Sequence, residues 1–450
     1  MRMQTNERGA FTEYLRGSLW ILPAVAVILA LASGAILSGI SVEADTFLGR
    51  LLFQGDAGAA REVLIIVSAT MITVTGVVFS LTVVALQIAS SQFSPRLLRN
   101  FFRDRPNQIV LAIFVGTFAY SLAGLHTVGT PDEGGEVFVP RLAISGAMFL
   151  ALLSVAALVY FLHHVAHSIQ IDDIMRRVER ESLAVLHTLP PPFNGPVPEP
   201  PPDARVVRAM HSGYVQATNA EALVVYAATH DLTIRFLPQV GHHLVCGAPL
   251  AAVWSPDGIG DPAHPRVEAV VNDGVRIGFE RTMEEDVSFG VRQLVDIALR
   301  AESPAINDPY TSVQAVQHAA VVLASAAERG AGPEMRSDAA GVPRVVVPRH
   351  TLDDYLQLAC AQLRRVASHE AAVVVALARL LEAVAQHARE PHEREAIRRQ
   401  LALLREDAAR ETRQPADLDE VERGLADVEA ALDELPSSAV PLASPSFSRK

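Results

Sequence analysis

The residues with the clearest capacity for chemistry lie in one stretch of the second half of the chain. Two predicted helices are joined there by a Ser-Pro-Ala-Ile-Asn-Asp-Pro turn. The charged and amide side chains of the first helix and the turn are Arg292, Asp296, Arg300, Asn307 and Asp308. Together with the turn amides, these groups suit a small-ligand or nucleotide pocket. The competing interpretation is a structural turn, in which Asp308 caps the second helix and Pro309 is its first residue.

The residue types that are scarce in this chain exclude much other chemistry. The two cysteines, Cys246 and Cys360, form no Cys-x-x-Cys pair, and the only lysine is Lys450. A zinc ribbon, an iron–sulfur cluster, a Walker A lysine and a Schiff-base lysine are therefore not expected. We predict no metal, no cofactor and no enzymatic activity. The formal net charge of −12 argues against nonspecific nucleic-acid binding, which needs many basic residues.

A second set of polar residues recurs every three or four positions in an apolar segment, so it shares one helical face. Its members are Thr73, Gly76, Ser80, Gln87, Ser91 and Ser94, with the apolar Val84 at the intervening position. Small and hydroxyl residues let membrane helices pack closely, and the same composition lines pores, so both interpretations stay open. The basic residues that follow are Arg96, Arg99, Arg103 and Arg105. They suit the cytoplasmic mouth of an anion-favouring pore, or simply positive charge that orients the chain.

Four apolar segments must position this polar face. A membrane-spanning helix needs about 20 mostly apolar residues, and such stretches lie at about 19–40, 63–89, 109–125 and 142–165. Arginines precede the first, separate the second from the third and follow the fourth, whereas the other two loops are acidic or mixed. Because positive loops stay in the cytoplasm, we predict a multi-pass protein of the bacterial inner membrane. Both termini, including residues 1–18, face the cytoplasm.

The rest of the chain is predicted to be cytoplasmic, which gives an α+β protein with a four-helix transmembrane domain. Its parts are a helix with a Pro-rich linker at 169–202, a small β-rich module at 203–282, a helical region at 283–435 and a disordered tail at 436–450. Asn219 is the expected N-cap of one helix within the module. Near the end of the chain, a short heptad seam is expected to pack on a neighbouring helix; it consists of Leu418, Val421, Leu425, Val428 and Leu432.

Two motifs resemble a known bacterial family. One is the second span with its exit, TVTGVVFSLTVVALQIASSQFSPR from Thr73 to Arg96, and the other runs from Phe289 to Thr311. Both resemble the predicted membrane proteins grouped as domain of unknown function 2254, over about residue 10 to at least residue 430. The resemblance implies membrane location and this overall architecture. It implies no activity and no catalytic residue.

Together these features favour an oligomeric channel or transporter-like protein in the lipid bilayer. In a homo-oligomer the second span would line the path, and the cytoplasmic part would gate it or bind a ligand. The alternative is a membrane-anchored scaffold or sensor, which the Pro-rich linker and the heptad seam motivate. A membrane enzyme ranks last because Arg292, Asp296, Asn307 and Asp308 make no recognised catalytic set.

Overall fold

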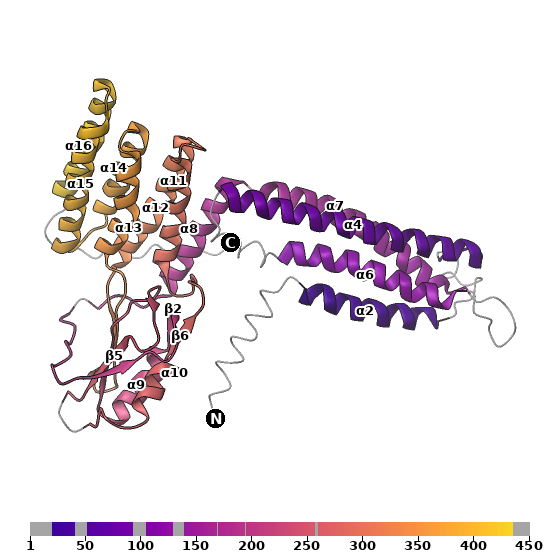
Figure 1. The fold of residues 1–450 in the computed structure, drawn as a ribbon, viewed down its shortest axis with the longest axis horizontal. Helices are drawn as coiled ribbons and strands as arrows, with labels where there is room; N and C mark the ends of the chain where they lie inside the picture. Colours follow the sequence, from indigo (N-terminus) through magenta and orange to yellow (C-terminus); the bar gives the residue numbers. More distant parts are fainter. Residues whose placement is uncertain are drawn as a thin grey trace. The chain divides into compact units, whose positions relative to one another are not determined.

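The computed structural model describes residues 20–40, 52–92, 105–128, 139–168, 170–193, 195–256 and 260–434. The chain divides into two compact units, Met1–Asp173 and Ile174–Lys450. Apolar helices make up the first unit, and small sheets with further helices make up the second (Figure 1). The predicted α+β class is therefore confirmed.

Four helices of the first unit are long and apolar enough to cross a membrane. They are α2 (Ile21–Ser38), α4 (Ala57–Gln92), α6 (Arg105–Thr127) and α7 (Arg141–Ser168). Each matches one apolar segment of the sequence. Helix α4 has 36 residues, which at about 1.5 Å per residue makes it about 54 Å long. The hydrocarbon core of a bilayer is about 30 Å thick. Helix α4 is therefore longer than a single crossing of the core needs.

Helix α6 is the central helix of the first unit. It contacts α2, α4 and α7, and half of its apolar stretch is buried, against 17% in α2 and in α4. Small residues let α2 lie close to it, because a Cβ added at Gly34 would come within 2.8 Å of the Ala123 Cβ. On another side the hydroxyls of Thr117 and Ser154 lie 3.1 Å apart and link α6 to α7. Close backbone approach and interhelical hydrogen bonds are typical of membrane bundles.

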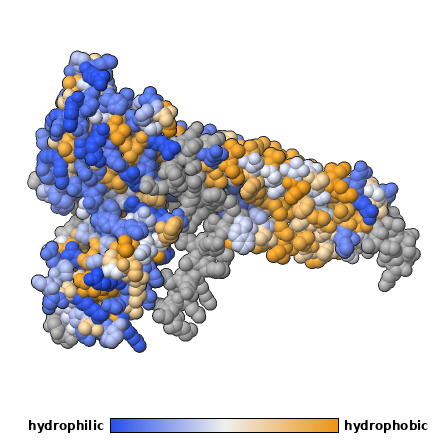
Figure 2. Space-filling view, in the orientation of Figure 1, coloured by the Kyte–Doolittle hydropathy of each residue, from blue (hydrophilic) through white to orange (hydrophobic). Residues whose placement is uncertain are grey.

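The surface of the first unit matches its helices. Figure 2 shows apolar side chains over these helices and hydrophilic ones over much of the second unit. Large side chains such as Phe149, Leu152 and Val159 on α7 are more than half exposed. In water such a continuous apolar surface would be unstable, whereas in a bilayer it meets lipid.

The second unit begins with an amphipathic helix and a β-rich module. Helix α8 (Ile171–Thr188) buries Met175, Val178 and Leu186. The strands are β1 (Arg205–Arg208), β2 (Gly213–Thr218), β3 (Thr233–Phe236), β4 (His243–Leu244), β5 (Pro249–Trp254), β6 (Val275–Gly278), β7 (Glu334–Ser337) and β8 (Pro343–Val347). They form one sheet of order β1-β5-β3-β8-β7 and another of order β4-β2-β6.

Two short helices belong to the same module. Helix α9 (Ala220–Thr229) begins after Asn219, whose side chain accepts a hydrogen bond from the Ala222 amide, so the predicted N-cap is confirmed. Helix α10 (Val267–Asp273) precedes β6. The apolar core between helices and sheets includes Leu223, Ile234 and Phe236.

The second unit also contains a group of six helices. They are α11 (Val287–Ala301), α12 (Pro309–Arg329), α13 (Leu352–Ala367), α14 (Ala371–Ala385), α15 (Pro391–Glu411) and α16 (Pro415–Glu434). Strands β7 and β8 lie between α12 and α13, so the region predicted as helical also completes the larger sheet. The α16 seam packs within the chain, with Val421, Leu425 and Val428 fully buried against neighbouring helices.

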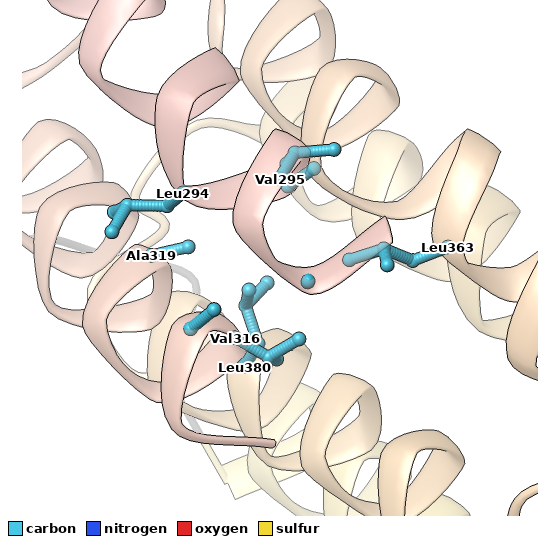
Figure 3. A pocket seen from close by; sticks show the side chains of 9 residues that line it. Leu294, Val295, Val316, Ala319, Leu363 and Leu380 are labelled. Atoms are coloured by element: carbon cyan, nitrogen blue, oxygen red, sulfur yellow. The ribbon is translucent and has the colours of Figure 1, made fainter. Parts of the chain in front are cut away.

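The centre of this group of helices is tightly packed. A small gap lies between α11, α12, α13 and α14, and every residue around it is aliphatic (Figure 3). Leu294, Val295, Val316 and Leu380 are among the residues that line it, and it has no room for a water molecule. Dry packing defects of this kind are ordinary features of a protein core rather than ligand sites.

Candidate functional site

The polar face of the second span lies on the outside of the four-helix unit. Thr73, Gly76, Ser80 and Gln87 are all exposed, and a Cβ added at Gly76 would meet no atom within 4 Å. The Thr73 hydroxyl donates to the Ala69 carbonyl of its own helix at 2.9 Å. Within the described residues of the first unit, this face therefore does not pack against another helix.

The packed side of α4 lies opposite. Leu64, Met71 and Val78 are buried against the neighbouring helices, and at about 100° per residue they fall on the far side of the helix from Gly76 and Ser80. The exposed apolar Val84 interrupts the polar face between Ser80 and Gln87. Large exposed apolar residues flank the face on both sides; they include Ile65, Ile66, Ile72, Val77, Phe79, Leu81 and Val83. The result is a narrow polar strip within an apolar surface.

The predicted cytoplasmic mouth is only partly described. Arg96, Arg99 and Arg103 lie outside the described residues, and Ser91 belongs to α4 but its side chain is not described. Arg105 is the exposed first residue of α6. The strip can therefore be followed as far as Gln87.

The second candidate, the turn between α11 and α12, is held by local contacts. Asp308 accepts hydrogen bonds from the Thr311 amide at 3.2 Å and the Thr311 hydroxyl at 2.6 Å, so its predicted capping role is confirmed. Asn307 has a φ of +50°, a left-handed conformation that asparagine adopts more readily than most residues. These contacts are those of a helix start.

The charged residues of α11 are also engaged. Arg292 pairs with Asp296 at 2.8 Å and donates to the Gln362 side chain of α13 at 2.5 Å. Arg300 lies in the last turn of α11, where a positive charge interacts favourably with the helix dipole. Arg292 and Asp296 thus lie together on one face of α11, and Arg292 links α11 to α13.

A buried polar group fixes the other end of α11. Asp286, 3% exposed, caps the helix and pairs with Arg281 at 2.5 Å. Ser288 donates a hydrogen bond to the same carboxylate at 2.7 Å.

Burial lowers the pKa of His350, whose ring lies 5.6 Å from that of Tyr355. In the part of the chain that the structure describes, no three His, Cys, Asp or Glu side chains are grouped as metal ligands.

A third site lies in the second unit, where an open polar cleft of about 380 Å³ is formed by five segments. Its walls come from the end of α8, the β2–α9 junction, the loop before α11, strand β7 and the segment after β8. Its charged lining residues are Glu221, Glu284, Glu285, Glu334, Arg336 and Arg349. Ligand sites of small molecules span about 300–1,000 Å³, and this cleft falls in that range.

An ion-pair network forms the floor of the cleft. The Glu334 side chain, 5% exposed, accepts from Arg349 and from Arg336, both at 2.7 Å. Arg349 also reaches Glu285 at 3.1 Å, and Glu285 accepts from the Thr218 hydroxyl. No sequence motif pointed to this site, because its members come from distant segments and two of them lie on a strand that the sequence did not predict.

Comparison with known proteins places the chain among membrane proteins. The model of a family described as Predicted membrane protein (DUF2254) matches residues 16–383. An uncharacterized protein of Mycobacterium tuberculosis and one of Mycobacterium bovis are each 47% identical over 399 residues, covering 87% of this chain and 76% of the relative. No solved structure matches the chain. The names of these relatives state no activity.

Proposed function

Because the chain belongs to the DUF2254 family of predicted membrane proteins and has four candidate spans, we propose that it is an oligomeric channel or transporter-like protein of the bacterial inner membrane. Copies of α4 line the path, and the second unit senses a ligand in the cytoplasm. The arginine-rich loops place both termini on the cytoplasmic side. The protein acts without catalysis.

The observation that carries this proposal is the exposed polar strip on α4. Its hydroxyl, amide and glycine positions face away from the chain's own helices. Polar side chains in membrane spans face protein or water rather than lipid. Several copies of the chain therefore surround a water-filled path with this face, and the apolar residues beside it, such as Val77 and Phe79, form the contacts between copies.

The length of α4 sets the depth of each residue. Arg61 and Glu62 lie near its first turn, so the hydrocarbon region begins close to Val63 and extends for about 20 residues. Gly76 and Ser80 then lie within it, and Gln87 lies near the cytoplasmic boundary. In this arrangement the path passes Gly76 and Ser80 inside the membrane and leads toward the arginine-rich loop.

Helix α8 links the sensing part to the spans. It begins at Ile171, shortly after α7 ends at Ser168. Within the second unit, Glu179 of α8 pairs with His318 of α12 at 2.5 Å. A rearrangement of the second unit that shifts α8 is thereby transmitted along the chain to α7.

Two sets of contacts in the second unit lead us to rank the competing functions below this proposal. The scaffold interpretation drew on the heptad seam, and Val421, Leu425 and Val428 are occupied by the chain's own helices. The enzyme interpretation drew on the α11–α12 turn, where Asp308 caps a helix and Arg292 pairs with Asp296. Neither set of contacts accounts for the exposed polar strip on α4, whereas the channel proposal does.

Reaction with a membrane-impermeant thiol reagent tests the proposal. The background variant is Cys246→Ser, since Cys246 is exposed and Cys360 is buried. Gly76→Cys and Ser80→Cys are expected to react in the membrane because they line water. Val77→Cys and Phe79→Cys are the matched controls, because these positions are also exposed and lie on the same turns. They are expected to stay unmodified because they face protein or lipid.

The same labelling experiment can also contradict the proposal. Equal, slow modification at all four positions would mean that the strip meets no water, and the path proposed along α4 would be wrong.

A further inference from the structure

We propose that the polar cleft of the second unit binds a small amino-acid-like molecule, with an ammonium group beside a carboxylate and a net charge of zero or +1. This proposal deepens the ligand-sensing part of the proposed function. The binding itself rests on the cleft alone, and only its effect on the spans rests on the channel.

The ion pairs of the cleft leave two groups available. Glu334, Glu285 and Arg349 are engaged with one another, and Glu284 pairs with Arg276. Glu221, exposed in the first turn of α9, has no polar partner among the described residues. Arg336 uses its Nε on Glu334, and its two terminal nitrogens have no partner within the same described part.

These two free groups define the ligand chemistry. The Glu221 carboxylate accepts from an ammonium group, and the terminal nitrogens of Arg336 donate to a carboxylate. The other charged groups balance one another: three carboxylates, of Glu284, Glu285 and Glu334, face three guanidinium groups, of Arg276, Arg336 and Arg349. The carboxylate of Glu221 therefore gives the cleft a net charge of −1. A ligand with a net negative charge is repelled, whereas a basic or neutral amino acid is matched.

The position of the cleft connects an occupant to α8. Thr188, Leu189 and Pro190 at the end of this helix form part of its wall. Arg329 at the end of α12 donates to the Leu189 carbonyl, so this wall is attached to the helical group. A ligand that bridges Glu221 and Arg336 therefore contacts α9, β7 and the end of α8 at the same time.

Calorimetric titration of the full chain in lipid nanodiscs tests the proposal. L-Arginine is the probe, and L-glutamate is the comparison of similar size with the opposite net charge. We expect L-arginine to bind and L-glutamate to bind at least tenfold more weakly. Glu221→Gln should weaken L-arginine binding at least tenfold, because it removes the free carboxylate without breaking a hydrogen bond or ion pair to another described residue.

Matched variants separate the site from general charge effects. Glu395→Gln removes an exposed carboxylate of α15 far from the cleft lining, and it should leave binding unchanged. Arg336→Gln should also weaken L-arginine, and a thermal melt of each variant shows whether the fold survives.

Three results would overturn the proposal: no binding of either L-arginine or the neutral L-glutamine at millimolar concentration, an unchanged affinity in Glu221→Gln, or tighter binding of L-glutamate. Calorimetry reads binding alone. A protein that binds L-arginine but passes no current would thus contradict the channel and support the cleft, and the reverse pattern would do the opposite.

Discussion

At the scale of single residues, the polar side chains divide between those that hold helices in place and those that remain available. Asp308, Arg292 and Asp286 belong to the first kind, because each caps a helix or bridges two segments. Glu221 belongs to the second, since it has no polar partner among the described residues, and on α4 the strip around Gly76 is likewise open. The proposed functions rest on the second kind.

Removing the cap at Asp308 tests the assignment of the α11–α12 turn. Asp308→Ala is expected to lower stability by about 1 kcal/mol, the usual loss for an N-cap, with no change in conductance. Asp308→Asn keeps a good capping side chain and should retain most of the stability. Thermal melting of the purified variants measures both. Loss of conductance in a stable Asp308→Ala protein would instead reveal a functional role for this turn.

Glu302 should make stability depend on pH. Burial, reinforced by the carboxylates of Glu370 and Asp308, raises its pKa. A carboxyl with a raised folded-state pKa holds its proton more tightly when folded, so stability falls as pH rises from about 4.3 through the folded value. Glu302→Gln should therefore gain stability over wild type as pH increases. Exposed Glu395→Gln is the control, and a pH-independent difference for Glu302→Gln would contradict this account.

At the scale of helices and strands, local patterns predicted most of the molecule. Four apolar runs became α2, α4, α6 and α7, and capping residues marked the starts of α9 and α12. Strands β7 and β8 were missed because they are short and flanked by helices. Their place in the sheet comes from the parallel pairing of β8 with β3, a contact between distant segments that no local pattern encodes.

The close contact of α2 with α6 gives a prediction for a single methyl group. Gly34→Ala would place its Cβ 2.8 Å from the Ala123 Cβ and 3.1 Å from the Tyr120 carbonyl oxygen, so we expect a loss of about 1–3 kcal/mol from overpacking. Gly76→Ala meets no atom and should stabilise α4 by up to about 1 kcal/mol through helix propensity. The melting temperatures of both variants and of wild type in detergent measure these effects. A Gly34→Ala protein as stable as wild type would argue against the close packing of α2 on α6.

At the scale of the whole molecule, the sequence predicted the membrane part and missed the cleft. The polar strip was visible because its members repeat along one helix. That the strip faces outward followed only from the burial of the opposite side, around Met71 and Val78. The cleft gathers Glu221, Glu334 and Arg349 from segments far apart in the chain, so only the assembled fold brings them together.

Conductance of the purified protein in a planar bilayer tests the central claim most directly, with wild type compared with Gly76→Leu and Val77→Leu. Gly76 faces open space on the polar strip, so leucine fits the fold and narrows the path, whereas Val77 is an exposed apolar neighbour. We predict discrete currents for wild type and Val77→Leu and a loss of at least tenfold for Gly76→Leu. Folded, inserted wild type without current, or equal currents in all three proteins, would contradict a path along α4.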